Sequence, residues 1–263
     1  MGEFKNRLAR IKRDHPYCCF CGGTAPTETI EHAPPRVMFI QKLRPKGHEF
    51  PACKRCNNGT SQQDQVAALM LFSTAETFFP GKFRHDFEKA VLGVANNAAD
   101  AINYINTDAE NEIWTNTDAP NQEILAIPVN KRLFSQWLNP WAAKQACAMW
   151  YQQTGLILSE EQQILVKWQI NPLEVGDDFL AFITENLTNG FHLSQGKNSF
   201  EAQFFYNFAI DESKRFGAFW MVVHSVVGCL CLIADANYFK NDTKIEYGEL
   251  FRTGRNNGLS RTL

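Results

Sequence analysis

Two Cys-x-x-Cys pairs near the N-terminus constrain the fold of this chain more than any other feature. Cys18 and Cys21 form the first pair, and Cys53 and Cys56 form the second. A gap of two residues lets two thiolates bind one tetrahedral Zn²⁺, so the two pairs predict a structural zinc ion with four sulfur ligands. Such a site is coordinatively closed, so we expect the zinc to hold the fold and to take no part in chemistry. Cys19 has no partner at this spacing and is expected to be a bystander.

The segment around these pairs is expected to fold only as a metal-stapled module. Residues 17–58 are rich in cysteine, glycine, proline and charge, with only short apolar stretches. A segment of this kind cannot build much of a hydrophobic core by itself. The 31 residues between the pairs exceed the roughly 15–20 residues typical of a zinc ribbon. They predict a hairpin, with one strand running into Glu31-His32, a wide proline-containing loop, and a return strand into Cys53.

The charge of the chain is divided unevenly along its length. The formal net charge is −2, but residues 1–60 carry 11 Lys and Arg against 5 Asp and Glu, whereas the remainder carries 15 against 23. A basic end is what a phosphate-binding surface requires. Basic residues that merely solvate a small module would give the same asymmetry.

The N-terminal sequence MGEFKNRLARIKRD does not resemble a signal peptide. We therefore expect a cytoplasmic protein whose paired cysteines bind metal and form no disulfides. The most apolar stretch, 216–234, has His224 and Ser225 at its middle and is rich in β-branched residues. It predicts buried strands and no membrane span. The remaining cysteines are expected to be buried thiols: Cys147, Cys229 and Cys231.

The chain after the cysteine-rich segment predicts a mixture of helices and antiparallel strands. Ser61 is expected to open a helix, with Asp64 as its capping-box partner. Apolar and polar residues alternate over 200–208, which is typical of a half-buried strand. The tail, 252–263, is polar and is expected to be loose. Further helices are expected at 3–13, 84–104, 139–153, 159–168 and 177–187.

The cysteine pairs, the acidic-His pair ending the first strand, the asparagine after the last cysteine and the following helix resemble the HNH endonuclease family, the ββα-metal or His-Me finger nucleases. The most similar variant is the zinc-containing, four-cysteine one that includes phage endonuclease VII. The string EHAPPRVMF…FPACKRCNNGTSQQD resembles a bacterial branch of that family. The resemblance covers residues 17–70, about a quarter of the chain, and we recognise no family in the C-terminal part. It implies a zinc-stapled, treble-clef-like nuclease module over 1–70. Together with the helices and antiparallel strands that the residue pattern predicts over 71–263, this gives an α+β protein of two domains.

Residue by residue, the resemblance implies a hydrolytic site. His32 matches the general base and Glu31 the metal-binding carboxylate beside it. Asn57 matches the amide that joins that carboxylate on one divalent ion, Mg²⁺ or Mn²⁺. Aspartate is more usual at the position of Glu31, and the extra methylene can shift the metal or change its identity. No second HNH histidine follows Asn57, and Asp64 is the nearest ionisable side chain that can take that place.

The chemistry of phosphodiester hydrolysis agrees with these residue types. A neutral imidazole suits deprotonation of water, and carboxylate and amide oxygens suit Mg²⁺ or Mn²⁺. Consecutive strand residues point to opposite faces, so Glu31 and His32 can converge only if the strand end is distorted. Three basic side chains are candidates for phosphate contacts, or else part of a solvated surface: Arg36, Lys54 and Arg55.

Two other functions fit the same residues. The module can be a zinc finger that binds nucleic acid or protein without cutting. In that case His32 is a polar strand end, Asn57 caps the Cys-x-x-Cys turn, or knuckle, that it follows, and Asp64 is a helix cap. A pure binding finger has no need of the Glu31-His32 pair, so we favour a metal-dependent endonuclease that acts on DNA rather than RNA. The acidic, aromatic-rich C-terminal part can also sense a ligand, or form a homo-oligomer, and so gate the nuclease.

Overall fold

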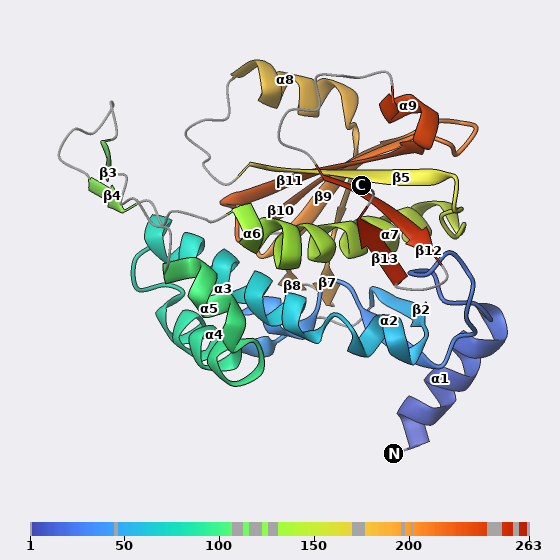
Figure 1. The fold of residues 1–263 in the computed structure, drawn as a ribbon, viewed down its shortest axis with the longest axis horizontal. Coiled ribbons are helices and arrows are strands. Elements are labelled where there is room, and N and C mark those ends of the chain that lie inside the picture. The colour runs from blue at the N-terminus through green and yellow to red at the C-terminus, as the bar shows by residue number, and fades with distance from the viewer. Residues whose placement is uncertain are drawn as a thin grey trace.

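The chain folds into layers of helices around an antiparallel sheet, as Figure 1 shows. The structure is a computed structural model, and it describes residues 2–44, 47–106, 113–115, 123–125, 131–169, 177–195, 198–200, 202–240, 249–254 and 258–261. Over these residues the architecture is mixed α and antiparallel β, as the sequence predicted.

The N-terminal segment forms a helix, a two-stranded hairpin and a second, short helix. Their bounds are α1 Gly2–Asp14, β1 Thr29–His32, β2 Glu49–Ala52 and α2 Lys54–Asn58. The two strands are antiparallel, with His32 opposite Glu49. The loop between them contains two 3-10 turns, Arg36–Met38 and Ile40–Lys42. The predicted hairpin, with its wide loop, is therefore confirmed.

A helical layer follows the hairpin. α3 (Ser61–Phe78) packs beside α4 (Arg84–Asn97), and α5 (Ala99–Asn106) continues from it. After a small hairpin, the chain turns through α6 and a π-helical turn into α7; the bounds are β3 Ile113–Thr115, β4 Glu123–Leu125, α6 Lys131–Leu133, π-turn Phe134–Leu138 and α7 Asn139–Thr154. Pro140 lies in the first turn of α7, directly after the π-helical turn. Gly155 ends the helix with φ 70°, a conformation that glycine adopts without strain.

The large sheet has seven antiparallel strands in the order β13-β12-β5-β11-β10-β9-β6. Its strands are β5 Gln162–Gln169, β6 Asn189–His192, β9 Phe204–Ile210, β10 Gly217–Val223, β11 Val227–Asp235, β12 Glu249–Gly254 and β13 Gly258–Arg261. A separate pair is formed by β7 Ser194–Gln195 and β8 Asn198–Ser199. Consecutive strands β9, β10 and β11 are neighbours, which is typical of short antiparallel connections.

Helices cover both faces of this sheet. α8 (Asp177–Asn186) and α9 (Ala236–Lys240) lie on one face, and α7 lies on the other, between the sheet and the N-terminal elements (Figure 1). Every residue of α7 from Trp141 to Trp150 is buried, although the sequence there is not uniformly apolar. Because α7 is enclosed on both sides, its polar residues must find partners inside the protein.

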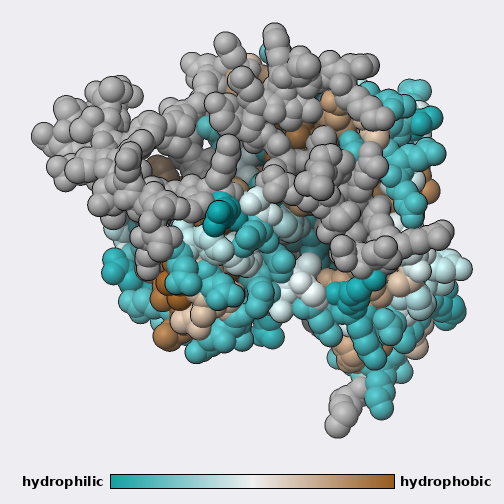
Figure 2. All heavy atoms as spheres, viewed as in Figure 1, coloured by the Kyte–Doolittle hydropathy of each residue, from teal (hydrophilic) through white to brown (hydrophobic). Residues whose placement is uncertain are grey.

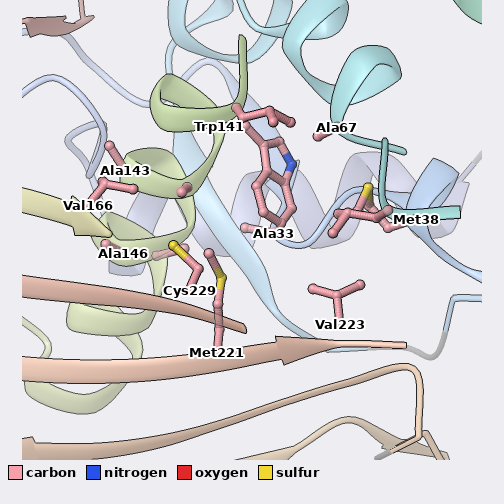
Figure 3. Close-up of a cluster of buried hydrophobic side chains, with 14 of the residues drawn as sticks. Ala33, Met38, Ala67, Trp141, Ala143, Ala146, Val166, Met221, Val223 and Cys229 are labelled. Carbon is pink, nitrogen blue, oxygen red and sulfur yellow. The ribbon is translucent and has the colours of Figure 1, made fainter. Parts of the chain in front are cut away.

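The hydrophobic core is continuous from the cysteine-rich segment to the sheet. Figure 3 shows a part of this core that is drawn from four places in the chain: Ala33 and Met38 from the β1–β2 loop, Ala67 from α3, Trp141, Ala143 and Ala146 from α7, and Val166, Met221, Val223 and Cys229 from the sheet. The domain boundary predicted after residue 70 falls inside α3. The division into two functional units stays a prediction.

Most of the predicted elements are confirmed. α1, α3, α7 and α8 match four predicted helices, and β10 with β11 match the buried strands expected within 216–234. β9 matches the strand expected within 200–208, displaced toward its C-terminal end. The helix predicted at 84–104 is divided at Ala98 into α4 and α5. The thiols outside the cysteine pairs are buried as expected, and Cys229 and Cys231 lie on one strand face with their sulfurs 3.9 Å apart.

Three local predictions are wrong. The helix predicted at 159–168 is the strand β5, because its short run Ile164-Leu165-Val166 lies between β11 and β12 in the sheet interior. The tail predicted to be loose contributes β12 and β13. The capping box of Ser61 and Asp64 does not form, since Thr60 precedes α3 and its carbonyl accepts from the Asp64 N–H.

On the face shown in Figure 2, the coloured part of the surface is mostly hydrophilic and its brown areas are small. Among the described residues, the large apolar side chains that are most exposed lie far apart in the sequence, and they include Phe4, Tyr17, Leu43, Leu92 and Tyr238. None of the described helices is long and apolar enough to cross a membrane.

Candidate functional site

The four paired cysteines come together in the N-terminal segment. The sulfur atoms of Cys18, Cys21, Cys53 and Cys56 all lie within 4.8 Å of one another, and all four residues are buried. Four sulfurs bound tetrahedrally at about 2.3 Å from Zn²⁺ would lie about 3.8 Å apart, so only small movements bring these atoms to one ion. The cluster can therefore hold a metal such as zinc, as the spacing predicted.

Both knuckles place a backbone amide on the first cysteine of the pair. The N–H of Phe20 donates to Cys18 Sγ, and the N–H of Cys56 donates to Cys53 Sγ, each at 3.4 Å. Amide donors stabilise negative charge on sulfur, and so they favour the thiolate form that binds metal. The donor lies two residues after the accepting cysteine in the first pair and three residues after it in the second.

Cys19 lies beside this cluster but does not join its four sulfurs. Its backbone N–H donates to the Pro51 carbonyl at 3.0 Å, which ties the first knuckle to β2. Burial raises the pKa of the Cys19 thiol well above its usual range, so this side chain stays neutral. Its geometry agrees with the bystander role that we predicted.

The end of β1 sends its two candidate catalytic residues to opposite sides. The side chain of Glu31 is 6% exposed and that of His32 is 37% exposed. Glu31 turns inward toward α7, whereas His32 turns outward toward Glu49 on β2. The ordinary alternation of a strand is kept, and Glu31 Oε1 reaches back only to accept the backbone N–H of His32 at 3.0 Å.

Inside the protein, Glu31 is paired with a lysine that the sequence did not single out. Lys144 Nζ lies 2.9 Å from Glu31 Oε2, and the Lys144 side chain is 2% exposed. The same ammonium donates to the Thr60 hydroxyl and lies 5.7 Å from the centre of the Phe20 ring. A buried carboxylate is stable only with such a partner, so this ion pair joins β1 to α7.

Asp64, a residue of α3, lies near this ion pair. Its Oδ1 is buried without a hydrogen-bond partner. Burial raises the pKa of Asp64 to about 7, the positive charge of Lys144 lowers it, and the negative charge of Glu31 raises it. The Asp64 carboxyl therefore gains a proton at a much higher pH than an ordinary aspartate, whose pKa is about 3.9.

Asn57 holds the strand that carries the site. Its side-chain Nδ2 donates to the Ile30 carbonyl at 3.1 Å and to the Thr29 hydroxyl at 3.2 Å. Its backbone N–H donates to the Cys53 carbonyl at 3.1 Å. Asn57 thereby connects the second knuckle to β1, which is one of the two roles that the sequence left open.

His32 lies in a strongly basic environment on the outer side of the hairpin. Its Nε2 is 3.7 Å from Glu49 Oε1, and the same carboxylate oxygen is 2.9 Å from an Arg7 guanidinium nitrogen. Partial burial, followed by the positive charges of Arg44, Arg7 and Arg36, lowers the pKa of His32 to about 4. His32 is consequently neutral at physiological pH and can accept a proton.

Arg44 is fixed in the wall of this site. Its guanidinium donates to the carbonyls of Pro34, Gly47 and His48 at 2.7–2.8 Å, which closes the base of the wide loop. Burial lowers the pKa of Arg44 to about 10, which still leaves it charged. Its positive charge is therefore a permanent feature beside His32.

The C-terminal elements hold the loop that follows His32. The backbone N–H of Ile40 donates to Gln203 Oε1 at 2.9 Å, and that of Gln41 donates to Asp86 Oδ1 at 2.8 Å. His48 is buried at the other end of the loop, 4.5 Å from the Phe191 ring on β6. The site loop is thus positioned from α4 and from the sheet.

The remaining predicted basic residues lie at the protein surface. Arg36 is exposed in the loop, and its Nε donates to the Lys42 carbonyl at 2.8 Å. Lys54 and Arg55 are exposed in the first turn of α2. Of these three, only Arg36 influences the pKa of His32.

Sequence reasoning missed four site residues: Arg7, Arg44, Glu49 and Lys144. The first three come from the N-terminal segment, whose basic excess was the only signal for the two arginines. Glu49 could have been found from the hairpin register, since an antiparallel pair places it across from His32. Nothing in the sequence pairs Lys144 with Glu31.

Comparison of the chain with protein-family models, with curated proteins and with solved structures finds no match.

Proposed function

We propose that the chain is a nuclease that hydrolyses phosphodiester bonds of nucleic acid, DNA in preference to RNA, with His32 as the general base. The observation that carries the proposal is the environment of His32. A neutral, partly exposed imidazole lies among three positively charged guanidinium groups, those of Arg7, Arg36 and Arg44. This combination suits an anionic substrate. The imidazole can remove a proton either from the substrate itself or from a molecule bound beside it.

In this proposal the residues around His32 divide the work. The His32 imidazole takes a proton from a water molecule that attacks the phosphorus atom, the P–O bond to the leaving sugar oxygen breaks, and that oxygen takes a proton from solvent water. Glu49 lies close enough to His32 Nε2 to orient the ring and to stabilise the imidazolium that forms. Arg7 and Arg36 bind phosphate oxygens, for which the planar guanidinium is well suited, while Arg44 contributes its fixed charge.

Binding of a phosphate would also make His32 a better base. The three guanidinium charges lower the pKa of free His32, and a phosphate anion among them would offset that effect. The site would therefore be strongest as a base when substrate is bound.

The proposal assigns the four-cysteine cluster to structural zinc. The ion would clamp both ends of the hairpin, and so hold His32 on β1 against Glu49 on β2. A closed four-thiolate site has no position for water or substrate, so zinc plays no further part.

The nuclease resemblance also implies one Mg²⁺ or Mn²⁺ on Glu31, Asn57 and Asp64, and these residues do not fit that role. Glu31 is already paired with the Lys144 ammonium, whose positive charge opposes a divalent ion at the same carboxylate. Among the described residues, the one cluster of three or more potential His, Cys, Asp or Glu ligands is the four cysteines. We derive no step from a second metal.

A non-catalytic zinc finger that binds nucleic acid or protein is the second candidate. It is favoured by the structural bonds of Asn57 and Glu31, both of which a binding module could use to hold its hairpin. It leaves the neutral His32 beside Glu49 without a task.

Incubation of the purified protein with supercoiled plasmid DNA tests the nuclease proposal. Parallel reactions contain Mg²⁺, Mn²⁺ or metal-depleted buffer, and a structured RNA replaces the plasmid in a second set. We expect wild type to nick DNA and the His32→Ala variant to be at least about 10²-fold slower, the usual contribution of a general base. The matched control is His85→Ala, since His85 is an exposed histidine on α4.

Zinc content and nucleic-acid affinity of the His32→Ala variant should equal those of wild type. If wild type and His32→Ala cleave at the same rate, the nuclease proposal for this site is wrong. If wild type binds DNA but cleaves neither DNA nor RNA under any of these conditions, the second candidate replaces it.

A further inference from the structure

The Lys144 ammonium lies in an environment that contains almost no water. Lys144 Nζ contacts Glu31 Oε2 at 2.9 Å and the Thr60 hydroxyl, with the Phe20 ring 5.7 Å away. Carboxylate, hydroxyl and aromatic face are the three kinds of partner that stabilise a buried cation. The inner side of Glu31 thus already has a complete cation site, and the chain itself supplies the cation.

This ammonium cannot easily move away to make room for an ion. Lys144 lies in the middle of α7, where its neighbours Ala143 and Gln145 are also buried. The helix is enclosed by the sheet on one side and by the N-terminal elements on the other (Figure 1). A divalent ion on Glu31 would therefore lie in contact with a like charge at low dielectric, which is strongly unfavourable.

Lys144 also has a structural link to the proposed base. The Glu31 carboxylate that it holds accepts the His32 backbone N–H through Oε1 at 3.0 Å. Asn57 holds the preceding residue of β1 from the other side, at the Ile30 carbonyl. The end of the strand is thus fixed from both α7 and the second cysteine knuckle, and no metal ion is needed to fix it.

We propose that the Lys144 ammonium takes the place of the divalent ion on Glu31, so that no Mg²⁺ or Mn²⁺ binds there and cleavage requires none. Lys144 is on this view a positioning residue, acting on His32 through Glu31. The part of the proposal that concerns cleavage rests on the proposed nuclease function. The part that concerns binding of metal does not.

Titration with Mn²⁺, followed by the electron paramagnetic resonance signal of the free ion, tests the binding part. We expect wild type to remove no Mn²⁺ from solution at submillimolar concentrations. Lys144→Met should create one Mn²⁺ site, because it leaves Glu31 and Asp64 buried without their counter-charge. Glu31→Gln in the same Lys144→Met protein should remove that site again. Lys89→Met, at an exposed lysine on α4, is the matched control and should behave as wild type.

If Lys144→Met does not fold, Mn²⁺ titration of wild type and of Glu31→Gln still tests the proposal. One Mn²⁺ bound by wild type and lost in Glu31→Gln would overturn the proposal. Zinc content must be measured in every sample, so that a change at the cysteine cluster is not mistaken for a change at Glu31.

Cleavage in metal-depleted buffer tests the second part. The zinc is kept in place by avoiding strong chelators, and the rate is compared with and without added Mg²⁺. Equal rates support the proposal, whereas cleavage that appears only with added Mg²⁺ overturns it. Absence of cleavage under all conditions would refute the nuclease function, while the Mn²⁺ titration would still decide what Lys144 does.

Discussion

Two buried clusters of polar side chains, the four cysteines and the Glu31–Lys144 ion pair, differ in which parts of the chain supply their residues. The sulfur cluster is built from two short motifs of the N-terminal segment, Cys18 to Cys21 and Cys53 to Cys56. The ion pair of Glu31 with Lys144 joins a strand of that segment to α7, a helix buried against the sheet. The sulfur cluster joins two parts of the N-terminal segment to each other, and the ion pair joins that segment to the rest of the protein.

The hairpin is therefore not held by its cysteine cluster alone. Its strand end is fixed by Asn57 from the knuckle side and by Lys144 from α7, and its loop is fixed by Gln203 and Asp86. The geometry of His32 therefore depends on residues along most of the chain. A truncated N-terminal module would contain the zinc site but lose the α7 and loop contacts.

Loss of a zinc ligand should have the largest effect on stability. Structural zinc contributes on the order of 10 kcal/mol to the folding free energy of small modules. The net free energy of unfolding of a typical protein is of similar size, about 5–15 kcal/mol. Because the core is continuous across α3 and α7, we expect Cys21→Ser to abolish zinc binding and cooperative unfolding together. Metal analysis and thermal unfolding by circular dichroism measure both.

Cys19→Ala is the matched control for that change. Cys19 is buried beside the cluster but outside its four sulfurs, so we expect one zinc ion per chain and a stability loss of about 1 kcal/mol. A Cys21→Ser protein that unfolds cooperatively at the wild-type temperature would show that the cluster does not hold the fold.

Breaking the buried ion pair should have the next largest effect. Lys144→Met leaves the Glu31 carboxylate buried without its partner, and a broken buried pair typically costs about 3–5 kcal/mol. Glu31→Gln should cost a similar amount for the same reason. The double variant should be much less destabilised than the sum of the two, because neither member of the Glu31–Lys144 pair is then left buried alone. Urea unfolding of the four proteins gives the coupling energy.

An ion pair with one exposed partner, Arg84 with Glu76, supplies the contrast. Arg84 is 63% exposed in its pair with Glu76, and Arg84→Gln should destabilise the protein far less than Lys144→Met. If the effects of Lys144→Met and Glu31→Gln simply add, the two residues do not act as a pair. The difference between the two buried clusters would then lose its basis.

The parts of the molecule that the sequence predicted are those that depend on local spacing. The cysteine motifs, the hairpin between them and helices such as α1 and α7 each follow from residues close together in the chain. The failure at β5 has the opposite cause. Its apolar run is too short to distinguish strand from helix, and only pairing with β11 and β12 decides the matter.

The candidate site shows the same division. The sequence singles out His32 and Glu31 as candidates, but the surroundings of both residues depend on long-range contacts that no spacing encodes. Lys144 reads in the sequence as an ordinary helical lysine, because its burial is a consequence of the layers on either side of α7. The guanidinium environment of His32 likewise requires α1 and the β1–β2 loop to be folded together.

The pH dependence of kcat/KM for cleavage tests most directly whether His32, in this environment, is the base. Because the base must be neutral, activity is present above the pKa of free His32 and is lost below it. With that pKa at about 4, we predict a constant kcat/KM from about pH 8 down to about pH 5.5, with zinc content verified at each pH. Arg7→Gln, which removes one of the charges that lower the pKa, should bring the onset of the decline to higher pH. A decline centred near the ordinary histidine pKa of about 6.5, or a profile that His32→Ala leaves unchanged, would contradict the account.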